Sequence, residues 1–345
     1  MGSAITVLGP VPGKELGMTL MHEHLLMDFR CRFNGSPASN SIGPDLELRD
    51  RWRLVKEPAG FEANLIRDDV VTACGEVDAF KRVGGQTIVD VTTEGIGPSP
   101  ASLVTIAQVT GVNIVASTGV YVHASHSPWV HESTTTQLAQ RMVDEIHVPD
   151  ADGIRRGFIG EIGADGPTAC EVKVVRAAAI AQRETGAPVS IHLLSGALPE
   201  TRADALAVVD EFVAAGGDSH RLIACHQDGS GTDMEFQEQL LRQGITLEYD
   251  TFGFESTFTY KGRYVQLPTD SQRIEEVASL WDRGWGDQVV LSQDVCYRMM
   301  TREWGGWGIA HILESLTARF EAAGVGSEQL EMMMVESPRR LLAFA

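Results

Sequence analysis

The eight residues GMTLMHEH, at positions 17–24, have the pattern of a short buried β-strand that ends in two histidines. Side chains alternate between the two faces of a strand, so His22 and His24 point to one side and Glu23 to the other. Two imidazoles placed in this way can chelate one metal ion from a single strand. The pair alone is weak evidence, because hydrogen bonds satisfy many such histidines. The positions of the other candidate ligands therefore decide the interpretation.

Apolar runs rich in β-branched residues recur along the chain, and each is followed by a stretch with helical periodicity. We expect strands at Met18–Leu25, Thr87–Thr92, Asn113–Thr118, Gly157–Gly163, Pro188–His192, Arg221–His226, Ile245–Asp250 and Gln288–Gln293. Helices are expected at Asp68–Val83, Thr135–His147, Ala169–Thr185, Ala203–Ala215, Asp233–Gln243, Gln272–Asp282 and Gly308–Ala323. Apolar strands that alternate with helices are typical of a parallel sheet, and eight such units predict an α/β fold, a closed (β/α)8 TIM barrel. No GxGxxG sequence follows the first strand, which disfavours a dinucleotide-binding fold.

Length and composition fit a globular protein, and we expect residues 1–345 to form one barrel domain. The net charge of −19 disfavours binding to nucleic acid or to an anionic membrane. No apolar stretch approaches the roughly 18 residues of a membrane span, and no secretory signal begins the chain. The five cysteines are scattered, which favours free thiols in a reducing cytoplasm over a disulfide framework.

Two long segments do not fit the repeat of strand and helix. Residues 26–63 follow the first strand and contain several arginines among Gly, Pro and Ser. Residues 251–270 follow the seventh strand and contain five aromatic residues: Phe252, Phe254, Phe258, Tyr260 and Tyr264. Long loops at the carboxyl ends of barrel strands usually shape the active site. We therefore expect both segments to border a pocket there.

Other predicted strands also end in residues that can bind a metal ion. Glu161 ends the fourth strand, His192 the fifth and His226 the sixth, and Asp294 follows the eighth. All of these side chains would reach the same rim of the barrel. Buried charges without a partner are costly, so this cluster predicts bound cations at the C-terminal face.

The arrangement of these residues resembles the phosphotriesterase family of the amidohydrolase superfamily, in its phosphotriesterase-related branch. The resemblance spans nearly the whole chain. It is carried by residues 17–24, by Ser117-Thr118-Gly119-Val120-Tyr121, by Cys225-His226-Gln227-Asp228, and by residues 305–312 with the sequence GGWGIAHI. It implies a hydrolase with a binuclear metal centre at the C-terminal mouth of the barrel.

The resemblance also implies how the ligands are divided between two divalent metal ions. One ion would be held by His22, His24 and Asp294, and the other by His192 and His226. The residue on the fourth strand would bridge the two ions together with a hydroxide. Many family members have a carboxylated lysine there, whereas this chain has Glu161, so we expect no CO2-dependent assembly. Because a glutamate is shorter, the fourth strand must lie closer to the metals, or the metals must shift toward it. Zinc is the expected metal, with manganese or cobalt as alternatives.

Several residues are candidates for catalysis or substrate contact. Two metals that share a water make a nucleophile near neutral pH, and Asp294 is placed to take its proton and deliver it to the leaving group. Tyr121 could meet the scissile carbonyl or serve only in packing. Asp228 could orient a ligand imidazole or relay a proton, or could be a helix N-cap. Asp250 and Arg298 are candidate substrate contacts. Four histidines without strand-end positions are expected at the surface or in loops: His123, His126, His131 and His220.

The substrate is a small molecule whose bond type the residues leave open. We favour a lactone or another carboxylic ester. An amidase of small N-acyl compounds is the first alternative and a phosphotriesterase the second. Outside the enzymes, a non-catalytic barrel that binds a small ligand is the competing hypothesis, but every expected metal-ligand position is filled. By analogy with the family, the protein could form a homodimer.

Overall fold

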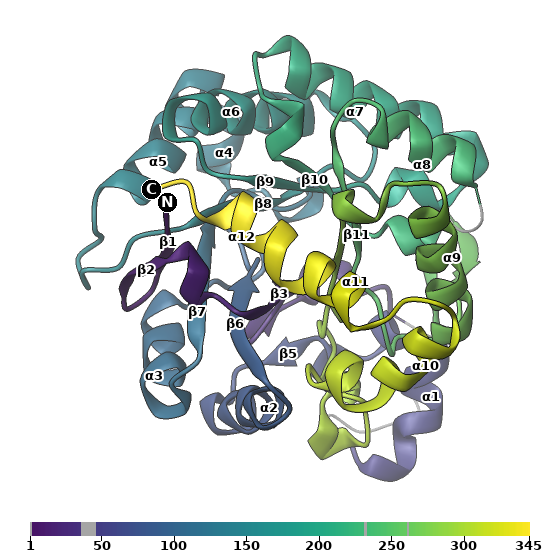
Figure 1. Cartoon of the computed structure of the whole chain (residues 1–345). Helices are drawn as coiled ribbons and strands as arrows, with labels where there is room; N and C mark the ends of the chain where they lie inside the picture. The colour runs from purple at the N-terminus through teal and green to yellow at the C-terminus, as the bar shows by residue number, and fades with distance from the viewer. Residues whose placement is uncertain (1, 36–45, 231–232, 261) are drawn as a thin grey trace.

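A parallel sheet of eight strands lies at the centre of the computed structural model, which describes residues 2–35, 46–230, 233–260 and 262–345 (Figure 1). The strands are, in order around the sheet, β3 (Met18–Glu23), β6 (Gly85–Asp90), β7 (Asn113–Thr118), β8 (Phe158–Gly163), β9 (Val189–His192), β10 (Leu222–Ala224), β11 (Thr246–Tyr249) and β14 (Val289–Leu291). A backbone hydrogen bond of 3.3 Å from Asp294 N to His22 O joins the first strand to the chain after the last. The predicted (β/α)8 barrel and all eight predicted strands are confirmed.

Helices surround the sheet (Figure 1). They are α2 (Val70–Arg82), α3 (Pro100–Thr110), α4 (Pro128–Glu132), α5 (Thr135–His147), α6 (Ala169–Thr185), α7 (Arg202–Ala214), α8 (Met234–Leu241), α9 (Asp270–Asp282), α10 (Thr317–Ala322), α11 (Ser327–Glu331) and α12 (Ser337–Leu342). Local sequence sets their ends: Thr168 caps α6 in a capping box with Glu171, and Gly186 ends that helix with a φ of 75°. The last predicted barrel helix begins at His311 instead of Gly308, and it contains a π-helical turn over Ile312–Leu316 before α10. Within the described residues, no helix combines the length and apolar character needed to cross a membrane.

The strands read as continuous apolar runs because both of their faces are buried. Side chains that point into the barrel form one cluster: Met21, Val89, Val91, Val115, Phe158, Ile223 and Val290. Leu341 and Leu342 of α12 belong to the same cluster, so this helix closes the N-terminal end of the barrel. Figure 1 looks onto this end, where α12 crosses the barrel. The opposite end is left for the site.

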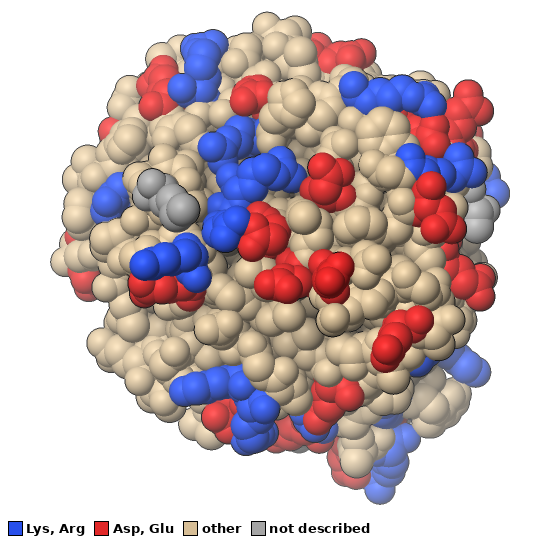
Figure 2. Space-filling model, in the orientation of Figure 1, with Lys and Arg blue, Asp and Glu red and all other residues tan. Residues whose placement is uncertain are grey.

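The two chain termini lie together beside α12 (Figure 1). Ser3 N donates to Ala345 O over 2.8 Å, and Ala345 N donates back to Ser3 O over 3.1 Å. A hairpin of β1 (Ser3–Thr6) and β2 (Gly9–Pro12), which the sequence analysis did not predict, forms this edge. On the same face, basic and acidic side chains lie next to one another (Figure 2). This face is therefore not uniformly negative, although the net charge of the chain is.

Both long loops contain short elements of their own. The first holds β4 (Met27–Asp28), which pairs with β5 (Ile66–Arg67), and helix α1 (Arg51–Lys56). The second holds an antiparallel hairpin of β12 (Thr257–Tyr260) and β13 (Arg263–Gln266). Residues 36–45 and 261 of these loops, and the side chain of Phe258, lie outside the described part. The elements of both loops stand at the C-terminal end of the barrel.

Candidate metal centre

The carboxyl ends of five strands bring the six predicted metal ligands together. They are His22, His24, Glu161, His192, His226 and Asp294. In the first set of ligands, His24 Nε2 lies 3.4 Å from Asp294 Oδ1 and 3.4 Å from Glu161 Oε1. His22 Nε2 lies 3.8 Å from the same oxygen of Asp294. These spacings between donor atoms suit ligands that surround one cation.

A second set of ligands meets the other oxygen of the same glutamate. Glu161 Oε2 lies 2.9 Å from His192 Nδ1 and 3.5 Å from His226 Nε2. The two imidazole nitrogens are themselves 2.7 Å apart. Glu161 therefore stands between the two sets, where a carboxylate can bridge two metal ions.

Two of these ligands have a strained backbone. His226 has a φ of 59° and Asp294 a φ of 45°, and they are the two residues other than glycine with positive φ among those described. An L-residue in the left-handed region costs about 1–3 kcal/mol and persists where the surrounding structure enforces it, often at functional sites. The chain thus turns sharply after β10 and β14 at the points where these side chains enter the site.

Buried partners fix the orientation of the histidine rings. His22 Nδ1 is 3.0 Å from Glu248 Oε2, and His226 Nδ1 is 3.0 Å from Asp250 Oδ1. A carboxylate accepts, so Nδ1 carries a hydrogen in each ring and Nε2 is the nitrogen that faces the other candidate ligands. In metal sites a carboxylate that accepts from Nδ1 commonly fixes the orientation of an imidazole that binds the metal through Nε2.

The centre contains buried polar atoms that a bound cation would satisfy. His22 Nε2 and Asp294 Oδ1 have no hydrogen-bond partner. Burial raises the pKa of Glu248 to about 8, and burial lowers the pKa of His22 to about 4. Burial also opposes protonation of His226, but Asp250 outweighs it and raises the pKa of His226 well above its usual value. Imidazole nitrogens and carboxylate oxygens with free lone pairs fit divalent zinc, manganese or cobalt.

A cavity of about 580 Å³ opens above the candidate ligands. Its floor includes His192, His226 and Asp294, whose side chain is 13% exposed. Its walls come from both long loops, as predicted: Phe29, Cys31, Arg32, Asn34, Gly35 and residues 56–59 from the first, and Thr251, Phe254, Thr257, Tyr264 and Leu267 from the second. Tyr121, Leu194, Gly229, Cys296 and Tyr297 complete the lining. The cavity has the size of a small-molecule site.

Tyr121 reaches this cavity as part of a group that the sequence analysis did not predict. Arg32 Nη2 donates to the Tyr121 hydroxyl over 2.9 Å, and the same guanidinium forms an ion pair with Asp165. Asp165 Oδ1 and Arg32 Nη2 also both lie within hydrogen-bond distance of His192 Nε2, at 3.1 Å and 2.9 Å. Burial raises the pKa of Tyr121 well above its usual value, and the phenol stays protonated. Arg32 and Asp165 therefore position both the tyrosine and a metal ligand.

Three residues that were expected to assist catalysis or to contact the substrate lie outside the cavity. Asp250 is fully buried behind His226 and touches its Nδ1, so it supports a ligand rather than a substrate. Asp228 accepts a 2.7 Å hydrogen bond from Arg273 Nε in a fully buried ion pair, and is neither a helix cap nor a neighbour of a ligand imidazole. Arg298 donates to Ile66 O in a separate pocket. None of the three residues therefore lines the cavity.

The sequence contains a pattern that could have identified some, but not all, of the residues that the sequence analysis did not predict. Glu248 and Asp250 are two residues apart at the end of β11, which is the same alternation that brings His22 and His24 together. Asp165 follows β8 by two residues, so a carboxylate near a strand end could have marked it. Arg32 lies in a 3-10 turn of the first long loop among other arginines, and nothing in the local pattern distinguishes it.

Comparisons with known proteins give a family match over nearly the whole chain. A model of the phosphotriesterase family matches residues 2–342. The N-acetyltaurine hydrolase of Salmo salar is 33% identical over 348 residues, which cover 99% of this chain and 98% of that protein. A resiniferatoxin-binding protein from Rhodobacter sphaeroides has a similar structure, with 34% identity, a TM-score of 0.93, and coverage of 99% of this chain and 95% of that one. A lactonase from Listeria monocytogenes shares the fold at 22% identity, with a TM-score of 0.78 and 99% of each chain covered.

Proposed function

This chain belongs to the phosphotriesterase family of hydrolases, and we propose that it is a binuclear metal-dependent amidase of small N-acyl compounds. The observation that carries the proposal is the position of Glu161. Its two oxygens face different sets of ligands, at 3.4 Å from His24 Nε2 and 2.9 Å from His192 Nδ1. A single carboxylate in this position can serve two cations at once. When bound, two such cations supply Lewis acidity toward a carbonyl oxygen and a nucleophilic water near neutral pH.

Asp294 is the residue best placed to move a proton. Its Oδ1 has no hydrogen-bond partner, and its side chain lines the floor of the cavity. A carboxylate there can accept a proton from the attacking water and deliver it to the leaving nitrogen. An amide requires this second transfer, because an amine leaves poorly as an anion.

Tyr121 can bind the substrate carbonyl. Its hydroxyl oxygen accepts from Arg32, so its own hydrogen is free to be donated into the cavity. Negative charge grows on the carbonyl oxygen as the tetrahedral intermediate forms, and a fixed donor there stabilises the transition state. The ring packs edge-on against His192 at 5.2 Å, which limits its movement.

The cavity suits a compact substrate with an apolar acyl part and an anionic end. Phe29, Phe254 and Tyr297 supply aromatic surface close to the metal ligands. Lys56 is exposed in the cavity lining, where its ammonium group can pair with an anion. Arg32 is already paired with Asp165 and is less free to do so.

We rank amides before lactones, the reverse of the order expected from the residues, on the basis of whole-chain similarity. The relative with an amidase name is 33% identical over nearly the full length of both chains, whereas the Listeria lactonase supports the fold alone. Lactone hydrolysis remains the second candidate, because the aromatic cavity and the proposed metal pair suit it equally well.

The deciding experiment is a comparison of kcat/KM on the zinc- and manganese-loaded protein. N-acetyltaurine and other N-acetyl amino acids, simple lactones and aryl phosphotriesters would be tested side by side. We expect the highest value for an N-acyl compound with an anionic end. A lactone turned over at least about tenfold more efficiently, which corresponds to about 1.4 kcal/mol of transition-state binding, would reverse the assignment.

A non-catalytic binding role has one specific observation behind it, the similarity to the resiniferatoxin-binding protein. Metal loading separates this role from catalysis. A protein that binds two metal ions per chain and hydrolyses none of the three substrate classes would favour ligand binding alone.

A further inference from the structure

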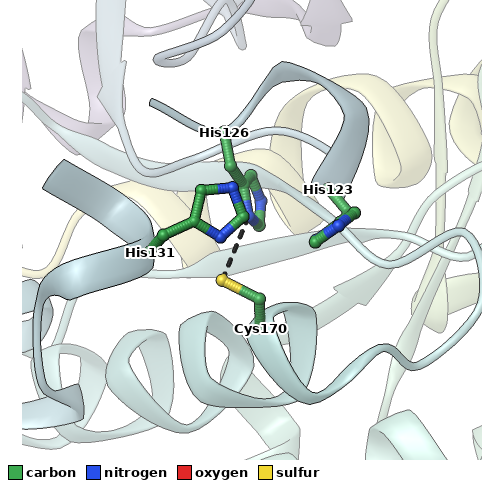
Figure 3. Close-up of side chains that lie close together, drawn as sticks. All are labelled: His123, His126, His131 and Cys170. Atoms are coloured by element: carbon green, nitrogen blue, oxygen red, sulfur yellow. Dashed lines mark hydrogen bonds between the residues drawn. The ribbon is translucent and has the colours of Figure 1, made fainter. Parts of the chain in front are cut away.

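Three histidines and one cysteine gather outside the candidate metal centre. His123, His126, His131 and Cys170 each offer a ligand atom, and these atoms all lie within 4.8 Å of one another. His126 Nδ1 and Cys170 Sγ are 3.3 Å apart. Figure 3 shows the sulfur rising from its helix toward the three rings. The sequence analysis expected the histidines only as separate surface or loop residues, and nothing in it joined them to Cys170.

The protonation of His126 is set by a backbone contact. Its Nε2 lies 2.8 Å from Tyr121 O, and a carbonyl oxygen can only accept, so Nε2 carries the hydrogen. The lone pair therefore sits on Nδ1, on the side that faces Cys170. A metal-binding imidazole commonly donates its other nitrogen to a carbonyl in this way.

The segments that carry the four residues are tied together by hydrogen bonds. Glu171 caps α6 through Thr168 and also accepts from His123 N over 3.2 Å. Lys173 of α6 donates to the carbonyl oxygens of Val130 and His131, over 2.6 Å and 3.0 Å, and so fixes the end of α4. The ligand atoms are thus held near one another before any ion binds.

The three imidazole rings of the cluster lie close together. The ring centroids lie 5.2–5.6 Å apart, so protonated rings would repel one another. Neutral rings and a thiolate would instead be attracted to a cation bound between them.

We propose that His123, His126, His131 and Cys170 form a zinc site separate from the candidate metal centre. Three imidazole nitrogens and one thiolate sulfur are a tetrahedral donor set for zinc. In such a site nitrogen and sulfur ligands are about 3.5 Å apart, as follows from bonds of about 2.0 and 2.3 Å, close to the spacing of His126 and Cys170. With four protein ligands the site would be closed, which is typical of a structural ion.

A zinc ion here would stabilise the segment that leads out of the cavity. His126 holds the carbonyl of Tyr121, whose ring lines that cavity. Binding energy at the cluster would therefore fix the loop that carries Tyr121. The site itself does not depend on the proposed amidase function.

Metal counting tests the proposal directly. The full-length protein would be loaded with excess zinc, freed of unbound metal by gel filtration, and measured by inductively coupled plasma mass spectrometry. We expect about three zinc ions per chain in the wild type and about two in Cys170→Ser and His131→Asn. Cys74→Ser and His220→Asn serve as matched controls outside the cluster and should keep about three. Equal zinc content in the wild type and in both cluster variants would overturn the proposal.

Cobalt gives a readout that identifies the sulfur ligand. Cobalt(II) bound to Cys170 would show a sulfur-to-metal charge-transfer band in the near ultraviolet. We expect this band to be lost in Cys170→Ser and retained in Cys74→Ser, with circular dichroism showing that both variants are folded. A band that persists without Cys170 would place the cobalt on another cysteine and refute the site. Neither measurement depends on turnover, so loss of hydrolysis cannot be mistaken for failure here.

Discussion

Asp294→Asn is the substitution that best separates proton transfer from metal binding. Asparagine retains one oxygen that a metal ion could use where Asp294 Oδ1 now stands, 3.4 Å from His24 Nε2 and 3.8 Å from His22 Nε2. It cannot accept the proton of the attacking water. The variant should therefore keep much of its metal, if loaded with excess zinc, and still lose catalysis.

The size of the loss follows from the role assigned to the carboxylate. General acid–base transfer contributes about 10²–10⁴-fold to a rate, which corresponds to about 3–5 kcal/mol of transition-state stabilisation. We therefore expect kcat for an N-acyl substrate to fall by about 10²–10⁴-fold, with a smaller change in KM.

The assay compares leaving groups at equal metal content. N-acetyl compounds need a proton on the leaving nitrogen, whereas nitrophenolate leaves from an ester without one. The loss in kcat should therefore be largest for the amides and smallest for nitrophenyl esters. Zinc content measured on the same samples controls for loss of the metal. If kcat falls equally for leaving groups of very different basicity, Asp294 serves only as a ligand and the proposed proton path is incorrect.

Three further substitutions test other parts of the structure. Tyr121→Phe removes the donor expected at the substrate carbonyl, so kcat should fall about 10²-fold at unchanged zinc content; an unchanged kcat would leave the tyrosine a packing role. Asp228→Asn removes one of the two carboxylates that pair with the buried Arg273, the other being Asp270, so denaturant unfolding should report a loss of about 1.5–3 kcal/mol, and a loss below about 0.5 kcal/mol would contradict the ion pair's importance. Burial raises the pKa of Asp270, but its 2.7 Å contact with His311 outweighs this and the net shift is downward. A lowered pKa stabilises the fold above about pH 4 and loses that contribution as the pH falls further. Melting temperatures between pH 7 and 3 should therefore fall less steeply in Asp270→Asn than in the wild type, and parallel curves would argue against the linkage.

The barrel could be predicted because its signals are local and repeated. Every strand is a short apolar run, since helices cover one face and the barrel interior the other, and periodicity reveals such runs directly. The ligands could be predicted for the same reason. His192 ends β9 and Glu161 lies within β8, so finding the strands also located the rim that the side chains share.

Residues on loops could not be predicted in this way. Arg32 reaches Tyr121 and Asp165 only because the first long loop folds back over the barrel mouth, and tertiary contacts determine that path. Cys170 begins a helix, yet it meets His126 because α6 packs beneath the loop after β7. The members of each group are near in space but far apart in the sequence. They share no periodicity, so a sequence pattern cannot reveal either group.

The short side chain of Glu161 makes a prediction about the packing of β8. A glutamate is shorter than a carboxylated lysine, which predicts that the fourth strand must approach the metals or the metals must shift toward it. Two glycines beside it permit close packing of β8: a Cβ on Gly160 would lie 2.4 Å from Ser190 Oγ, and one on Gly163 would lie 2.1 Å from Val122 N. No larger residue fits at either position without moving backbone or neighbouring strands. The two glycines therefore contribute to the site, because the close packing that they permit lets the short side chain of Glu161 lie between both sets of ligands.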